Sequence, residues 1–200
     1  YLFEKHPGQV KLSGNSGVMM ETLNSIYEDP ANATPNKKAI VKLLIKEFSG
    51  SINELKNEFA PLHTAISNQD LDLLQFLLKE GANIELEGPQ GITPLIMAIL
   101  VSDHVHGHEG SHSASNHEHE TGHGHQLEMV ELLLKSGADV HKKAMIGRDA
   151  IIESIRHRRE DITRILLQFG ANPKSADDDG VTCLHYAAYL GQSDICEILL

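Results

Sequence analysis

The stretch LDLLQFLLKEGAN, residues 71–83, recurs along the chain as LEMVELLLKSGAD at residues 127–139 and as EDITRILLQFGAN at residues 160–172. In each copy, apolar residues lie three or four positions apart, a spacing that predicts an amphipathic helix. A glycine follows each helix, at positions 81, 137 and 170, where helices commonly end in a left-handed residue. The start of a fourth copy, SDICEILL, occupies residues 193–200.

A second motif precedes these helices in the same register. It reads APLHTA at residues 60–65, TPLIMA at 93–98, DAIIES at 149–154 and TCLHYA at 182–187. Its copies lie 33, 56 and 33 residues apart, and the three glycines lie 56 and 33 residues apart. The two motifs therefore agree on a unit of 33 residues with one insertion of 23 residues. A unit this short cannot bury its apolar faces alone, so neighbouring units must stack.

These motifs resemble the ankyrin repeat family, whose pattern is Gly-x-Thr-Pro-Leu-His-x-Ala-Ala, then a second helix, then Gly-Ala-Asp/Asn. The resemblance covers residues 53–200 and implies an all-α solenoid of stacked helix–turn–helix units with short hairpin-like loops. The third unit departs most from the pattern, because Asp149 replaces the Thr, Ala150 the Pro and Ile152 the His. Ile96 and Cys183 are departures in the second and fourth units.

The register divides the chain into a divergent N-terminal repeat or helical cap, residues 1–52, and an ankyrin array, residues 53–200. The units span 53–85, 86–141 with a His-rich insertion at 103–125, 142–174, and a truncated 175–200. Within the first segment, residues 37–48 predict an amphipathic helix, and residues 19–28 are a candidate partner helix. The chain lacks an initiator Met and stops within an amphipathic pattern, so we expect a piece of a longer protein.

The composition disfavours several classes of function. The net charge is −11, from 17 basic and 28 acidic residues, so the average field repels nucleic acid. No apolar run is long enough to span a membrane. The two cysteines, Cys183 and Cys196, are too few for a disulfide framework and predict free thiols in a reducing compartment. We therefore expect a cytoplasmic location, or the host cytosol for a delivered bacterial protein.

No catalytic motif is present: the chain has no nucleophile elbow, phosphate loop, Cys-x-x-Cys pair or His-Glu-x-x-His sequence. His63 and His185 could in principle serve as bases or metal ligands. The family resemblance instead implies a structural role, in which the histidine ties its helix to the hairpin by hydrogen bonds. The sequence thus predicts a protein that is not an enzyme.

The insertion contains eight histidines and three interleaved glutamates but no Lys or Arg. Neutral imidazoles bind Zn²⁺, Ni²⁺ and Cu²⁺, which makes a metal site one interpretation. The alternative is a disordered polar segment tolerated at a surface turn, and a weaker variant is a pH sensor. The candidate metal ligands are His104, His106, His108, His117, His119, His123 and His125.

The resemblance implies that a partner protein binds the concave face, meaning the surface formed by the hairpin tips and the first helix of each unit. Met145 and Ile146 are unusual at a solvated tip and mark the preferred contact site. The candidate partner-binding residues are Ser67, Asn68, Met145, Ile146, Arg148, Arg156, His157, Asp178 and Tyr189.

Two further questions stay open at the level of sequence. The run Arg-His-Arg-Arg at residues 156–159, opposed by three aspartates at 177–179, is either a solvated turn with partial Arg–Asp pairing or a patch that selects an acidic partner segment. The fragment itself is either a binding scaffold or the targeting module of a larger enzyme or of a bacterial effector delivered into host cells.

Overall fold

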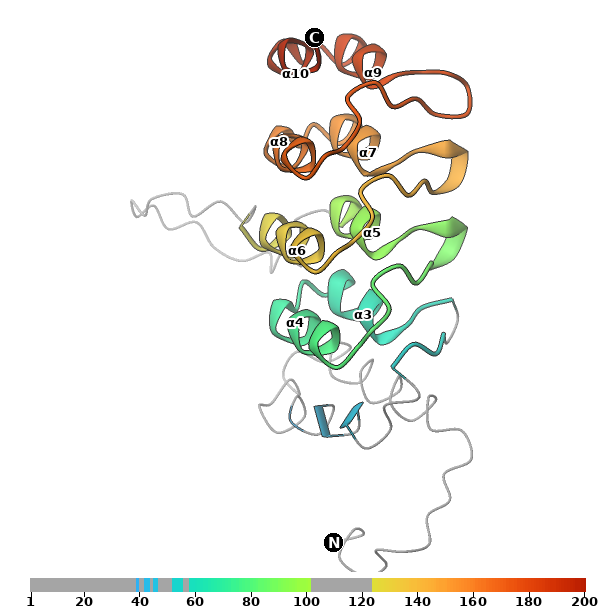
Figure 1. Ribbon diagram of the computed structural model, residues 1–200, viewed down its shortest axis with the longest axis vertical. Coiled ribbons are helices and arrows are strands. Elements are labelled where there is room, and N and C mark those ends of the chain that lie inside the picture. Colours follow the sequence, from blue (N-terminus) through green and yellow to red (C-terminus); the bar gives the residue numbers. More distant parts are fainter. Residues whose placement is uncertain (1–38, 40–41, 44, 47–51, 56–57, 102–123) are drawn as a thin grey trace, which may run out of the picture.

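The computed structural model describes residues 39, 42–43, 45–46, 52–55, 58–101 and 124–200. Within residues 58–101 and 124–200 there are eight α-helices and two short 3₁₀ helices, which stack along one axis (Figure 1). In chain order they are α3 (Pro61–Ser67), α4 (Leu71–Lys79), η3 (Pro89–Gly91), α5 (Pro94–Leu100), α6 (Gly124–Lys135), η4 (Met145–Gly147), α7 (Ala150–Arg156), α8 (Glu160–Gln168), α9 (Cys183–Tyr189) and α10 (Ser193–Leu199).

The helices form two rows. The inner row contains α3, α5, α7 and α9, and each of these helices packs on its neighbour in the row and on the second helix of its own unit. The second helices, α4, α6, α8 and α10, form the outer row, and the hairpin loops project beside the inner row, on the right in Figure 1. No β-strand occurs among the described residues, and an isolated antiparallel bridge joins Ala176 to Thr182. The predicted all-α solenoid is confirmed.

A Gly-Ala pair follows α4, α6 and α8 and ends each of these outer helices in the same way. Gly81 has φ +91°, and its N–H donates to the carbonyl of Leu78 at 3.2 Å. The N–H of Ala82 reaches back to the carbonyl of Leu77 at 2.9 Å. This left-handed termination satisfies carbonyls that the helix leaves unpaired. Gly137 and Gly170 repeat the arrangement, with φ of +95° and +89°.

The inner helices begin at the second motif. Pro61 and Pro94 occupy the first helical position, where a missing N–H costs nothing. The Thr93 hydroxyl accepts the N–H of Ile96 at 3.3 Å and caps α5. In the divergent third unit the Asp149 carboxylate caps α7 in the same way. Helix α7 accordingly has seven residues, the same length as the other inner helices.

One continuous apolar core runs through the stack. Its outer-row members are fully buried at helical spacing, namely Leu74 and Leu77 in α4, Val130 and Leu133 in α6, and Ile162 and Leu166 in α8. Burying each such side chain contributes about 1.5–3 kcal/mol relative to exposing it. The stability of each unit therefore depends on the units that cover it.

The predicted insertion and the N-terminal segment are only partly covered by the described residues. Residues 102–123, most of the predicted insertion, are outside the described residues, whereas Gly124 and His125 belong to α6. At the N-terminal end, the described residues of the predicted helix at 37–48 are helical, and Ile45 among them is buried in the core. The Lys42 ammonium lies 5.4 Å from the centre of the Phe76 ring in α4. The candidate helix at residues 19–28 lies outside the described residues.

Candidate functional site

The predicted contact positions on the first helices lie at one register in the stack. Ser67 is the last residue of α3, Arg156 of α7 and Tyr189 of α9. Asn68 and His157 are the residues that directly follow α3 and α7, and both are exposed. The ring of Tyr189 is the most open of these, since the residue is 88% exposed. The structure thus places these residues along one edge of the concave face.

Met145 and Ile146 form the tip of the third hairpin, in the short helix η4. They are 50% and 41% exposed, as predicted from their position. Ile146 has φ +64°, a left-handed conformation that is strained for a β-branched residue. The N–H of Asp178, on the next hairpin, donates to the Ile146 carbonyl at 3.1 Å. Neighbouring tips therefore support one another and hold these apolar side chains outward.

Arg148 is less exposed than Arg156, the other arginine among the predicted contacts. Only 20% of the Arg148 side chain is exposed, and its guanidinium lies 3.8 Å from Glu153 and 4.0 Å from Asp177. Arg148 therefore ties its hairpin to α7 and to the next hairpin. Its role on the concave face is to organise neighbouring side chains.

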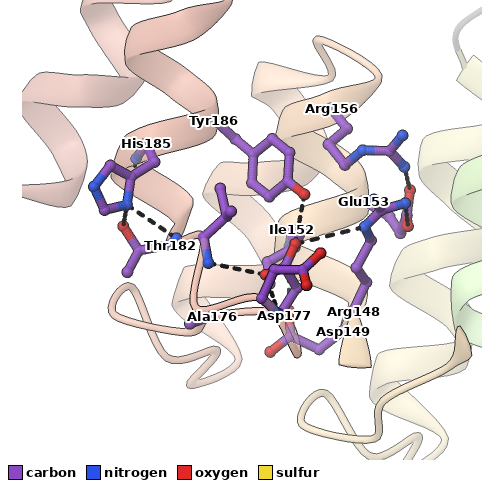
Figure 2. A network of polar contacts seen from close by, with 12 residues as sticks. Arg148, Asp149, Ile152, Glu153, Arg156, Ala176, Asp177, Thr182, His185 and Tyr186 are labelled. Carbon is purple, nitrogen blue, oxygen red and sulfur yellow. Dashed lines mark hydrogen bonds and ion pairs between the residues drawn. The ribbon is translucent and has the colours of Figure 1, made fainter. Parts of the chain in front are cut away.

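Figure 2 shows the polar network around these groups, including two residues that the sequence analysis did not select, Glu153 and Tyr186. The Glu153 carboxylate is almost fully buried and accepts a hydrogen bond from Arg156 at 2.7 Å (Figure 2). The guanidinium carbons of Arg148 and Arg156 each lie 5.9 Å from the centre of the Tyr186 ring. Both cations therefore contact the aromatic ring, an arrangement that stabilises them.

Asp177 links the network to the fourth hairpin. The Tyr186 hydroxyl donates to this carboxylate at 2.6 Å, and the backbone N–H groups of Val181 and Asp179 donate to its other oxygen. The hydrogen bond from Tyr186, aided by these N–H groups and by Arg148, lowers the pKa of Asp177. Burial and the bond to Asp177 raise the pKa of Tyr186. Asp177 is therefore a structural anion at neutral pH.

The repeat register of the sequence could have identified Glu153 and Tyr186, the two network residues that the sequence analysis did not select. Glu153 and Tyr186 occupy the motif position directly after the histidine position, the same position as Thr64 and Met97. At this position Thr64, Met97 and Tyr186 are half-buried, and the Glu153 side chain is almost fully buried. Aligning the units by this position would have selected Glu153 and Tyr186 as candidates.

Part of the basic run at residues 156–159 forms ion pairs within the protein, and part of it is exposed to solvent. Arg156 pairs with Glu153, and Arg159 makes two hydrogen bonds to Asp161, at 3.2 and 3.0 Å. Arg158 is exposed, and no ion pair joins it to a described residue. Among the aspartates at 177–179, the partner of Asp177 is Arg148. The basic run thus pairs with acids of its own unit.

His63 has the structural role that the family resemblance implied. Its Nδ1 atom accepts the N–H of Ala60 at 3.0 Å, so the ring proton lies on Nε2. That N–H donates to the carbonyl of Leu86 at 3.0 Å, in the loop that leads to the second unit. Burial lowers the pKa of His63, which keeps the ring neutral. In α9, His185 accepts the N–H of Thr182 at 3.1 Å.

The described residues offer little for catalysis or metal binding. Cys183 and Cys196 are both free thiols, and burial raises the pKa of Cys183 to about 12, so it is not a nucleophile at neutral pH. No group of three or more potential metal ligands occurs within the described ranges. Among the predicted metal ligands His125 is exposed on α6, and the others lie outside the described residues. No helix in the described part of the chain is long and apolar enough to cross a membrane.

Known proteins with similar sequences share this repeat. Putative ankyrin repeat protein L371 of Acanthamoeba polyphaga mimivirus is 25% identical over 166 residues, which are 82% of this chain and 19% of that protein. The human transient receptor potential cation channel subfamily A member 1 is 28% identical over 141 residues, 70% of this chain and 10% of the channel. The probable E3 ubiquitin-protein ligase XBOS33 of Oryza sativa subsp. japonica is 38% identical over 78 residues, 38% of this chain and 15% of the ligase. The chain spans less than a fifth of each of these relatives.

The family comparison agrees with the architecture. The family model for ankyrin repeats in three copies matches residues 31–106 and 118–200, and the model for one ankyrin repeat matches residues 90–144. The matched residues include the whole stack from α3 to α10 apart from the region of the insertion. This chain belongs to the ankyrin repeat family.

Proposed function

We propose that the concave face of the third and fourth repeats binds a partner protein, and that the array acts as a scaffold without catalysing a reaction. Ankyrin repeats are protein–protein interaction modules. The observation that carries the proposal is the exposure of Met145, Ile146 and Tyr189 on the same face as the Arg156 network. Tyrosine, arginine and methionine are enriched in protein interfaces.

The network favours binding because it fixes side chains in advance. Arg156 is held by Glu153 and by the ring of Tyr186, while a third of its side chain stays exposed. A side chain that is already ordered loses less conformational entropy when a partner binds. The outer row offers no comparable cluster in the described residues, where Arg164 pairs with Glu160 on the surface of α8.

The test is a triple variant that combines Met145→Ser, Arg156→Gln and Tyr189→Ser. We expect capture of partner proteins from a cell extract, measured by mass spectrometry after affinity purification, to fall strongly, with the thermal unfolding curve retained. The matched control is Phe169→Ser, which removes an exposed apolar side chain next to the outer helix α8. Equal capture by the triple variant and the control would contradict the assignment of the binding face.

The alternative function is a targeting module of a larger protein, either an enzyme or a bacterial effector delivered into host cells. It is supported by relatives in which similar repeats form a small part of a ubiquitin ligase or a cation channel. Sequencing the gene around the codons for residues 1–200 tests it. An adjoining catalytic domain would establish the module role, and stop codons immediately outside the array would exclude it. The two free thiols support the cytoplasmic location that we propose for either form.

A metal-binding role for the His-rich insertion is a separate proposal. Eight histidines between residues 104 and 125, with no Lys or Arg among them, support it. Calorimetric titration with Zn²⁺, Ni²⁺ and Cu²⁺ should compare the intact chain with a variant that lacks residues 103–123, which leaves α6 complete. Micromolar or tighter binding that the deletion abolishes is the expected result. Equal heats for the two proteins would exclude the role.

A further inference from the structure

We infer that the concave face recognises an acidic segment of its partner, and that Arg156 and Arg158 supply the charge for this recognition. The inference rests on the proposed function and specifies the chemistry of the partner. Its basis is a local reversal of charge, because the chain carries a net charge of −11 while the end of α7 presents Arg156, His157 and Arg158 in succession. We call these three residues the basic rim.

The basic rim keeps positive charge after its internal pairs are counted. Near it, Arg148 and Arg156 lie within ion-pair distance of the two buried carboxylates of Glu153 and Asp177. Arg158 has no ion pair with a described residue, so three cations are set against two anions. The carboxylates lie beneath the surface, whereas the Arg156 side chain is partly exposed and Arg158 is exposed. Solvent and a partner therefore meet the cations first. An anionic group at this surface is attracted by the excess charge.

The acidic tip of the fourth hairpin does not cancel this charge. Asp178 and Asp179 are exposed at that tip, and the Asp178 N–H donates to the Ile146 carbonyl of the third hairpin. The basic rim lies at the opposite end of the inner helix and begins at its last residue, Arg156. The concave face is therefore polarised, with acidic groups at the hairpin tips and basic groups at the far edge.

Apolar side chains flank the basic rim on both sides. The equivalent positions in the second repeat are Leu100 and Val101, both partly exposed, and in the fourth repeat the exposed Tyr189. Helices α5, α7 and α9 pack side by side, at an axial separation of about 8–10 Å for packed helices. An extended segment advances about 3.3 Å per residue. We therefore expect the acidic residue of the partner to lie about three positions from an apolar residue.

The experiment selects random peptides displayed on phage against the intact 200-residue chain. We expect the selected peptides to be enriched in Asp and Glu about three positions from an apolar residue. The second arm repeats the selection with Arg156→Gln combined with Arg158→Gln, and we expect the acidic enrichment to disappear. Arg164→Gln, at an exposed paired arginine of the outer row, is the matched control and should retain it.

A direct measurement follows with one selected peptide and its counterpart in which Gln replaces each Glu. Fluorescence anisotropy should show binding about ten- to a hundredfold weaker for the Gln peptide, and similarly weaker for the double arginine variant, since hydrogen bonds to charged groups are lost. Raising the salt concentration should reduce the difference between the two peptides.

The double variant must fold for this comparison. Thermal unfolding monitored by circular dichroism checks it. Arg158→Gln alone is the reserve variant, because Gln69 has the equivalent left-handed conformation in the first repeat, with φ +53° against +57° at Arg158. We expect this single variant to lose part of the preference for acidic peptides.

Several results would overturn the inference. One is a selection without acidic enrichment, and another is an enrichment that survives in the double variant. Arginine-dependent binding of phosphatidylserine vesicles or single-stranded RNA, with no selected peptide, would point to another class of partner. If substitution of Met145 and Tyr189 abolished peptide binding while the arginine variants bound normally, the proposed function would stand and this inference would fail.

Discussion

The first and third repeats build the same inner helix with different residues. Helix α3 begins at Pro61, and His63 accepts the N–H of Ala60 and donates to the carbonyl of Leu86. Helix α7 has neither proline nor histidine at these positions. There, one oxygen of Asp149 accepts the N–H of Ile152, and the other accepts the hydroxyl of Ser175.

The two solutions satisfy the same two requirements. Each start must pair an N–H that the helix leaves unbonded, and each must fasten the helix to the loop leading to the next unit. Leu86 and Ser175 occupy equivalent positions in those loops, since they follow Gly81 and Gly170 by the same five residues. The family pattern therefore records one way of meeting a geometric requirement, and a single carboxylate with two oxygens meets it as well.

The largest expected effect concerns the residue that replaces the histidine in the third repeat. Ile152 is fully buried in the core, so Ile152→Ala should lower the free energy of unfolding by about 2–5 kcal/mol, through lost burial and a cavity. Urea denaturation measures the change. Met145→Ala, at the exposed hairpin tip, is the control with a small expected effect. A loss no larger than that of the control would contradict the buried position of Ile152.

The next test compares equivalent glycines in two hairpins. Gly91 and Gly147 have φ of +72° and +68°, so alanine at either site costs about 1–2 kcal/mol from backbone strain. At Gly147 the added Cβ would also collide with the Asp178 carboxylate and lie 2.9 Å from the backbone nitrogen of Asp178. At Gly91 the nearest such atom is 3.9 Å away. Gly147→Ala should therefore shift the urea midpoint further than Gly91→Ala, and equal shifts would refute the contact between the third and fourth hairpins.

A third test separates the two functions of Asp149. Asp149→Thr keeps a capping oxygen and loses the tie to Ser175, whereas Asp149→Ala loses both. We expect Asp149→Ala to cost about 1–3 kcal/mol, since a cap is lost and a buried hydroxyl loses its partner, and Asp149→Thr to cost less. Thr93→Ala, which removes only a cap, is the reference. The order of the three costs is measured by chemical denaturation, and a cost for Asp149→Ala below that of Thr93→Ala would show that the tie contributes nothing.

The smallest expected effect is a dependence of stability on pH in the first repeat. Burial lowers the pKa of His63 in the folded state below its ordinary value of 6.5. As the pH falls below 6.5, the unfolded state binds a proton that folded His63 resists, so stability falls with falling pH. In His63→Gln this contribution is absent. Unfolding curves measured across the mildly acidic range should show a shallower pH dependence for the variant, and identical slopes would count against the neutral, buried ring.

The sequence predicted much of the fold because many of its requirements are local. Amphipathic spacing identified the helices, the glycine at 137 marked a left-handed helix end, and Pro94 marked a helix start. The exposure of Met145 and Tyr189 also followed from register, since equivalent positions in stacked units share an environment. The C-terminal boundary of the insertion was not predicted correctly. Helix α6 begins at Gly124, so Gly124 and His125, which the 33-residue register assigned to the insertion, belong to the helix.

By itself the sequence determined the 33-residue period of the array and the positions of its helices. Only the tertiary structure decided that Arg148 is an internal tie, that Glu153 and Tyr186 hold Arg156 in place, and that Asp149 reaches Ser175. The reason is that periodicity fixes which face of a helix a residue occupies, whereas Asp149 and Ser175, like Arg156 and Tyr186, belong to different units and meet only after the units have packed.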